Sequence, residues 1–81
     1  VHAFAPSAAA SRTNLREAGF PEADTVAALL ARRELQERVR GQVILVDEAA
    51  MLGTKETAEL FRLAGRLGAR LWLMGDDKQH K

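Results

Sequence analysis

Three short apolar segments alternate with longer stretches of helical spacing along the chain. Residues 1–5 (VHAFA), 43–47 (VILVD) and 69–75 (ARLWLMG) favour β-strands because large and β-branched apolar residues dominate them. The segment 43–47 is apolar at each position before Asp47, which is typical of a strand that is covered on both faces. The segment 69–75 has the same interior character, so we predict three buried strands.

Two helices are predicted between the first and second strands. Ser7 is suited to cap an Ala-rich helix that Gly19 ends, because Ser is a favoured N-cap and Gly a favoured C-terminal stop. After a loop at 20–24, Asp24 is a suitable N-cap for the second helix, which Gly41 ends. The apolar stripe of this second helix is expected to contain Val26, Leu29, Leu30, Leu35 and Val39.

A third helix is predicted at 54–67, with Gly68 at its end. Its core face is expected to contain Ala58, Phe61, Ala64 and Leu67. The other apolar residues expected to pack in the core are Met51, Trp72 and Met74. No hairpin signal such as Asn-Gly joins the strands, so we predict parallel strands with right-handed crossovers. The predicted fold class is α/β, a parallel three-stranded sheet with flanking helices.

Polar residues follow each of the three predicted strands. They occur in APS (5–7), DEA (47–49) and GDD (75–77). In parallel α/β sheets, ligands bind beyond the carboxyl ends of the strands, where these three segments are expected to meet. The pattern therefore predicts one functional edge of the sheet.

Asp47 and Glu48 end an apolar run, which is the Walker B pattern. One carboxylate helps to hold Mg²⁺, usually through water, because this ion keeps much of its hydration shell. The second accepts a proton from the water that attacks a phosphoryl group, or orients that water. The alternative is that the pair caps the next helix or lies in a polar loop. Gln79, after the next strand, favours the first interpretation because it could contact a terminal phosphate.

Four segments resemble motifs of superfamily-1 DNA helicases. VILVDEAAM (43–51) and LWLMGDDKQH (71–80) resemble motifs II and III, and they are most similar to the RecD-like branch, especially the helicase portion of MobF-type conjugative relaxases. AFAPSAAAS (3–11) resembles motif Ia, and GFPEADTVAALL (19–30) resembles the stretch after it. His80 favours the relaxase-helicases. The resemblance implies part of a RecA-like P-loop NTPase domain, with ATP and Mg²⁺ as ligands.

The resemblance also implies roles for individual residues near the nucleotide. Asp47 is similar to the Mg²⁺-coordinating aspartate, and Glu48 is similar to the catalytic base. Gln79 is similar to the residue that contacts the γ-phosphate and links hydrolysis to movement. Asp76 belongs to the same motif, with a supporting role.

Single-stranded DNA is the second ligand that the resemblance implies. Ser7 and Thr25 match positions that contact the DNA backbone. Hydroxyl groups that bind phosphates give the sequence-independent binding that a translocating motor requires. Arg12 is a further candidate for a phosphate contact, and its alternative interpretation is an ordinary surface residue.

The phosphate-binding motif G-x-x-x-x-G-K-[ST] does not occur in the sequence. In the family this motif precedes motif Ia, so we expect it upstream of residue 1, and a second RecA-like domain is expected elsewhere in the parent chain. Residues 1–81 are therefore expected to be a fragment of one helicase ATPase domain that is inactive alone. Its unpaired sheet edge favours self-association.

Composition narrows the alternatives only slightly. The 81 residues contain 12 Lys and Arg against 11 Asp and Glu, so no strong excess of positive charge indicates a nucleic-acid partner. Basic residues gather at 31–40, but Glu34 and Glu37 lie among them, as on a solvated helix face. Without cysteine the chain has neither disulfides nor a cysteine zinc site.

No apolar stretch reaches the roughly 18 residues of a membrane span, and no signal peptide opens the sequence, so we expect a cytoplasmic protein. Two other functions stay open. One is a degenerate, non-catalytic RecA-like module that binds single-stranded DNA or recruits partners. The other is a different P-loop ATPase such as an AAA+ protein, in which Asp-Glu also ends a strand.

Overall fold

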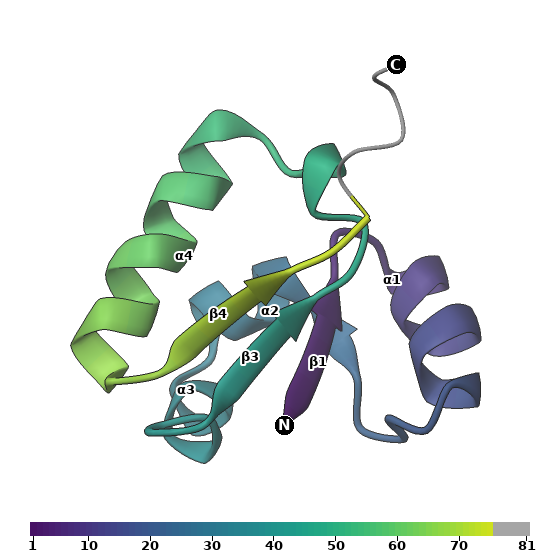
Figure 1. Ribbon diagram of the computed structural model, residues 1–81, viewed down its shortest axis with the longest axis horizontal. Coiled ribbons are helices and arrows are strands. Elements are labelled where there is room, and N and C mark those ends of the chain that lie inside the picture. Colours follow the sequence, from purple (N-terminus) through teal and green to yellow (C-terminus); the bar gives the residue numbers. More distant parts are fainter. Residues whose placement is uncertain (76–81) are drawn as a thin grey trace.

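The computed structural model describes residues 1–75, which form a parallel sheet with helices on both faces (Figure 1). The strand order is β2–β1–β3–β4. The strands are β1 (His2–Ala5), β2 (Asp24–Thr25), β3 (Val43–Val46) and β4 (Arg70–Leu73). The predicted parallel α/β fold is confirmed. The predicted number of strands is wrong, because Asp24 and Thr25 pair with Phe4 and Ala5 and form a fourth, very short strand.

The helices differ from the prediction in their bounds. They are α1 (Ala8–Ala10), η1 (Ser11–Leu15), α2 (Val26–Ala31), α3 (Arg33–Arg38), η2 (Ala49–Met51) and α4 (Thr54–Leu67). The predicted second helix is two helices, because Arg32 adopts an extended backbone between them. Asp24 is not its N-cap, since pairing with β1 holds Asp24 in β2 and the helix begins one residue later.

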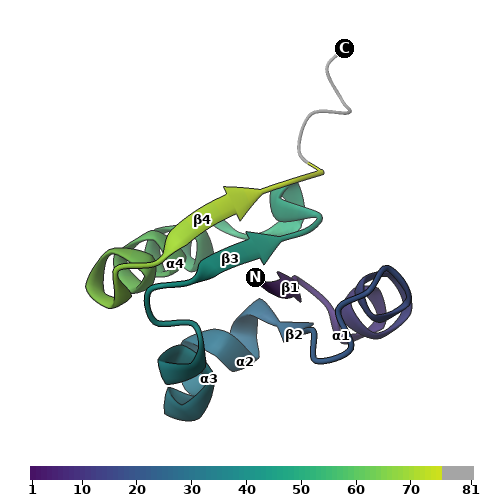
Figure 2. The same ribbon diagram turned by 60° about the horizontal axis from the view of Figure 1, so that its bottom comes forward.

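Two apolar clusters hold the sheet between its helices. The larger cluster lies between the sheet and helices α2, α3 and α4, and Phe4, Leu29, Ile44, Val46 and Leu60 are among its members. The smaller cluster lies on the other face, on the side of α1 and η1 (Figure 2), and consists of Ala3, Ala5, Leu15, Ala23 and Leu45. Adjacent residues of β3 contribute to both clusters, so the predicted burial of this strand on both faces is confirmed.

Helix α4 buries a stripe shifted from the predicted one. Leu60, Leu63, Ala64 and Leu67 are buried, while Ala58 and Phe61 are exposed. The observed stripe has the spacing i, i+3, i+4, i+7 and buries three leucines, so it removes more apolar surface from water than the predicted stripe. Gly68 ends the helix, as predicted, and adopts a left-handed conformation.

The three apolar residues predicted to pack in the core are exposed. Trp72 is 60% exposed, Met74 43% and Met51 73%. In β4, Leu71 and Leu73 pack against the larger cluster, so Trp72 lies on the opposite face. Among residues 1–75, β4 is an outer strand, and the exposure of Trp72 shows that this part of the opposite face is not covered by any described element. Within the same residues, no helix is long and apolar enough to cross a membrane.

Candidate functional site at the carboxyl edge of the sheet

The carboxyl ends of β1, β3 and β4 are joined by backbone hydrogen bonds. The N–H of Asp47 donates to the carbonyl of Phe4 over 2.9 Å, and the N–H of Met74 donates to the carbonyl of Val46 over 2.9 Å. The N–H of Ala49, just beyond β3, donates to the carbonyl of Met74, also over 2.9 Å. The segments after these three strands therefore meet at one edge of the sheet, as the sequence predicts.

Glu48 has a left-handed backbone conformation, with φ 58° and ψ 38°. Among residues 1–75 it is the only residue other than glycine with a positive φ. This conformation costs roughly 1–2 kcal/mol for a residue with a Cβ, and such strain is typical of functional sites. It turns the chain sharply between β3 and η2, so that both carboxylates of the pair lie at the end of the sheet instead of continuing the strand.

Asp47 stabilises this turn with one of its two carboxylate oxygens. Its Oδ1 accepts a hydrogen bond from the N–H of Glu48 over 2.9 Å. Both acidic side chains are half-buried, and neither forms an ion pair within residues 1–75. The second oxygen, Oδ2, has no hydrogen-bond partner among these residues. Asp47 therefore fits the task of holding hydrated Mg²⁺, which uses one or two carboxylates together with substrate phosphates.

No group of three or more His, Cys, Asp or Glu side chains that could hold a metal occurs within residues 1–75. Asp76 and Gln79, the other predicted nucleotide-binding residues, lie outside the described residues, as does His80. Gly75, which directly precedes them, lies against the turn at Asp47 and Glu48. The structure thus places the carboxylate pair and the start of the Gly-Asp-Asp segment together.

The predicted DNA-binding hydroxyls, Ser7 and Thr25, lie at the same edge. Ser7 follows β1, and Thr25 pairs with Ala5 at the end of that strand. Both residues cap helices: the hydroxyl of Ser7 accepts from the N–H of Ala10 over 3.1 Å, and that of Thr25 from Ala28 over 3.0 Å. Capping uses an acceptor site of each oxygen, and the hydroxyl proton can still be donated to a phosphate.

Arg12 is also on the helix that follows β1. It lies in η1, is exposed, and forms no ion pair within the described part of the chain. The carboxyl edge thus has two acidic side chains at its centre and two hydroxyl groups beside β1. A family model described as an AAA domain matches residues 1–81.

The chain belongs to the AAA domain family. The match extends over all 81 residues, and the parallel sheet with helices on both faces agrees with a P-loop NTPase fold of the RecA-like type. Membership implies an ATPase module that binds ATP, usually with Mg²⁺. Neither the curated proteins nor the solved structures contain a match to this chain.

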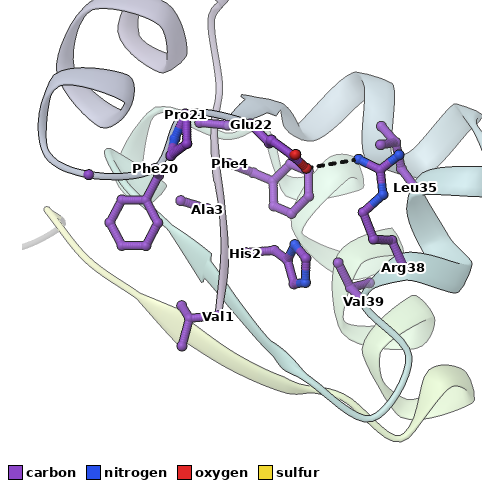
Figure 3. Close-up of a pocket in the computed structure, with 12 residues that line it drawn as sticks. Val1, His2, Ala3, Phe4, Phe20, Pro21, Glu22, Leu35, Arg38 and Val39 are labelled. Atoms are coloured by element: carbon purple, nitrogen blue, oxygen red, sulfur yellow. Dashed lines mark hydrogen bonds and ion pairs between the residues drawn. The ribbon is translucent and has the colours of Figure 1, made fainter.

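The AAA domain also has a pocket of about 210 Å³ at the amino end of β1 (Figure 3). His2 and Phe4 line it, and Glu22 and Arg38 form an ion pair of 3.4 Å at its wall. Burial lowers the pKa of His2; the charge of Arg38 lowers it further, while Glu22 opposes this effect. The pocket lies at the end of the sheet opposite to Asp47, away from the edge at which parallel sheets bind ligands.

Two features of the candidate site are not evident from the sequence. One is the left-handed conformation of Glu48. Glutamate rarely adopts a positive φ, so the sequence gives no reason to expect it. The other is the close approach of Gly75 to the turn after β3. A glycine at the end of the predicted strand 69–75 is the only signal in the sequence for this approach.

Proposed function

We propose that this AAA domain is part of an ATP-dependent DNA helicase motor, which couples ATP hydrolysis to movement along single-stranded DNA, in a conjugative relaxase or mobilisation protein. The observation that carries the proposal is the arrangement of the carboxyl edge. There, the acidic pair Asp47 and Glu48 lies beside the end of β1, which Ser7 and Thr25 flank. Because β1 and β3 are adjacent strands, the proposed hydrolytic groups and DNA contacts belong to the same sheet.

In this proposal Glu48 accepts a proton from the attacking water, and Asp47 holds the hydrated metal ion. The metal neutralises charge on the phosphates when it is bound. Asp47 also holds the backbone of Glu48 in place, because Oδ1 of Asp47 accepts a hydrogen bond from the N–H of Glu48. The positions of the two residues are therefore linked. Gln79 contacts the γ-phosphate, with Asp76 in a supporting role.

The hydroxyl groups of Ser7 and Thr25 donate hydrogen bonds to DNA phosphates, and Arg12 adds a charged contact. Contacts to phosphates carry no sequence information, which suits movement along any strand. The phosphate-binding loop and the second RecA-like domain are supplied by other parts of the full-length protein. These parts complete the ATP site.

The test is the ATPase activity of the full-length protein with and without oligo(dT). We expect wild-type activity to rise when the oligonucleotide is added. Glu48→Gln should reduce turnover by about 10²–10⁴-fold, since it removes a general base, while ATP affinity changes little. Glu17→Gln is the matched control, because Glu17 is exposed and forms no ion pair within residues 1–75.

Retained turnover in Glu48→Gln contradicts the role of Glu48. Binding of oligo(dT) by a wild-type protein that hydrolyses no ATP supports the non-catalytic RecA-like module instead. The third result is a protein that hydrolyses ATP but does not bind oligo(dT), so that the oligonucleotide does not change its activity. This result supports a different P-loop ATPase. These three results therefore separate the functions that the sequence leaves open.

A further inference from the structure

Gly75 lies so close to the turn after β3 that a side chain there would make unusually tight contacts. A Cβ built on Gly75 lies 3.0 Å from the N atom of Glu48, 3.2 Å from its Cα and 3.3 Å from Oδ1 of Asp47. Favourable contacts of carbon with neighbouring heavy atoms are about 3.5–4.0 Å long. An added methyl group would therefore press on three atoms of this turn at once.

Those three atoms cannot move away from an added methyl group independently of one another. Two of them, Oδ1 of Asp47 and N of Glu48, are the partners of the hydrogen bond that fixes the turn. On either side of the contact, the carbonyl of Met74 accepts from Ala49, and the N–H of Met74 donates to Val46. A methyl group at position 75 must therefore displace atoms of the turn by a few tenths of an ångström.

We propose that Gly75 is a positioning residue for Asp47 and Glu48. Its missing side chain lets the chain after β4 lie directly against the turn and keeps both carboxylates in one arrangement. The effect on turnover rests on the proposed function, in which Glu48 activates the attacking water. The geometric part does not, because it concerns only the hydrogen bond between Oδ1 of Asp47 and the N–H of Glu48.

The backbone conformation of Gly75 is a separate reason for a glycine, and a second glycine isolates it. Gly75 has φ +73° and Gly41 has φ +70°, so alanine is similarly strained at either position. The difference is space, since a Cβ on Gly41 meets no atom within 4 Å. Gly41→Ala therefore reproduces the conformational cost of Gly75→Ala without the contact at the site.

The experiment compares Gly75→Ala and Gly41→Ala in the full-length protein. Steady-state ATPase gives kcat and KM, thermal unfolding gives Tm, and hydrogen exchange measures the amides of Glu48 and Ala49. Both variants should lower Tm. Gly75→Ala alone should lower kcat about tenfold or more with little change in KM for ATP, because small displacements of catalytic groups are costly. It alone should also accelerate exchange at Glu48 and Ala49.

Equal kcat values for the two variants, in an enzyme that Glu48→Gln inactivates, overturn the proposed effect of Gly75 on catalysis and leave the proposed function intact. Full turnover in Glu48→Gln overturns the proposed function, and hydrogen exchange then still decides the geometric part. Unchanged exchange at Glu48 and Ala49 in Gly75→Ala overturns the positioning role, whatever the protein hydrolyses.

Discussion

The two ends of the sheet use charge and backbone conformation in different ways. At the carboxyl end, Asp47 and Glu48 have no ion-pair partner within residues 1–75, and Glu48 is held in a left-handed conformation. At the amino end, Glu22 pairs with Arg38, and the left-handed position before β3 is the glycine Gly41. Within residues 1–75, the acidic pair at the carboxyl end forms no ion pair and its turn is strained, whereas at the amino end Glu22 is paired and glycine takes the left-handed position.

This difference identifies which polar residues are available for chemistry. An ion pair on the surface is worth little for stability, but it occupies both of its members. The left-handed conformation of Glu48 costs stability, and strain of this kind clusters at functional sites. It therefore marks the acidic pair as the candidate for binding or catalysis. Three experiments, from the largest expected effect to the smallest, test how far the two ends differ.

A negative charge added at the carboxyl end should weaken DNA binding more than the same charge at the amino end. Thr25→Asp keeps an N-cap for α2, because Asp caps helices at least as well as Thr. It removes the hydroxyl donor and repels phosphates, so we expect about tenfold weaker binding of oligo(dT) at low salt, and a smaller effect at high salt.

The matched control is Gln42→Asp, because Gln42 is exposed just before β3 at the amino end. Fluorescence anisotropy with a labelled oligonucleotide measures both affinities. Equal weakening by the two substitutions would contradict a DNA-binding role that is specific to the carboxyl end.

Replacing Glu48 by glycine and replacing a left-handed glycine by alanine should change the free energy of unfolding in opposite directions. Glu48→Gly removes the strain of a Cβ at φ 58° and should raise the free energy of unfolding by about 0.5–1 kcal/mol. Gly68→Ala introduces that strain at φ 66°, where no neighbour lies within 4 Å, and should lower the free energy by about 1 kcal/mol. Urea unfolding followed by circular dichroism measures both; loss of stability in Glu48→Gly would show that the turn is not strained.

His2 should make the stability of the amino end depend on pH. Its pKa is lowered in the folded protein, first by burial and then by the charge of Arg38. The unfolded chain therefore binds more protons between the folded pKa and about 6.5, so stability is complete above pH 6.5 and falls as the pH decreases through this window. His2→Asn should remove this part of the pH dependence of urea unfolding. An unchanged pH profile in His2→Asn would mean that another group causes the dependence.

Much of the fold could be predicted because parallel α/β units leave strong local signals. The apolar run before Asp47 indicated a strand that is buried on both faces, and Gly68 marked the end of α4. The predicted meeting of the strand ends at one edge followed from topology alone, and backbone hydrogen bonds confirm it for residues 1–75. These features depend on periodicity and chain direction, which a single sequence contains.

The errors concern features that depend on tertiary neighbours. The position of Trp72 in an apolar strand indicated burial, but β4 is an outer strand among the described residues and one of its faces is uncovered. The predicted stripe of α4 contained Phe61, but the helix instead turns Leu60, Leu63 and Leu67 toward the core, because these leucines together bury more apolar surface. Pairing that uses only Asp24 and Thr25 is too short to leave a periodic pattern, so β2 was not predicted.

The candidate site was predicted in composition but not in conformation. Its acidic residues and hydroxyl groups lie at the edge where the sequence placed them. The left-handed turn at Glu48 and the approach of Gly75 result from the way β3 and β4 end together, which no local pattern of residues specifies. The roles of Asp76 and Gln79 remain predictions.

The exposure of Trp72 has a practical consequence for spectroscopy. Trp72 is the only tryptophan among the 81 residues, which contain no tyrosine, so it is the natural fluorophore of this domain. Because its indole already contacts water, emission should shift little when the apolar clusters melt. The same emission should move to shorter wavelengths when another protein segment covers that face of the sheet. Intrinsic fluorescence of this domain would therefore report docking on β4 better than unfolding.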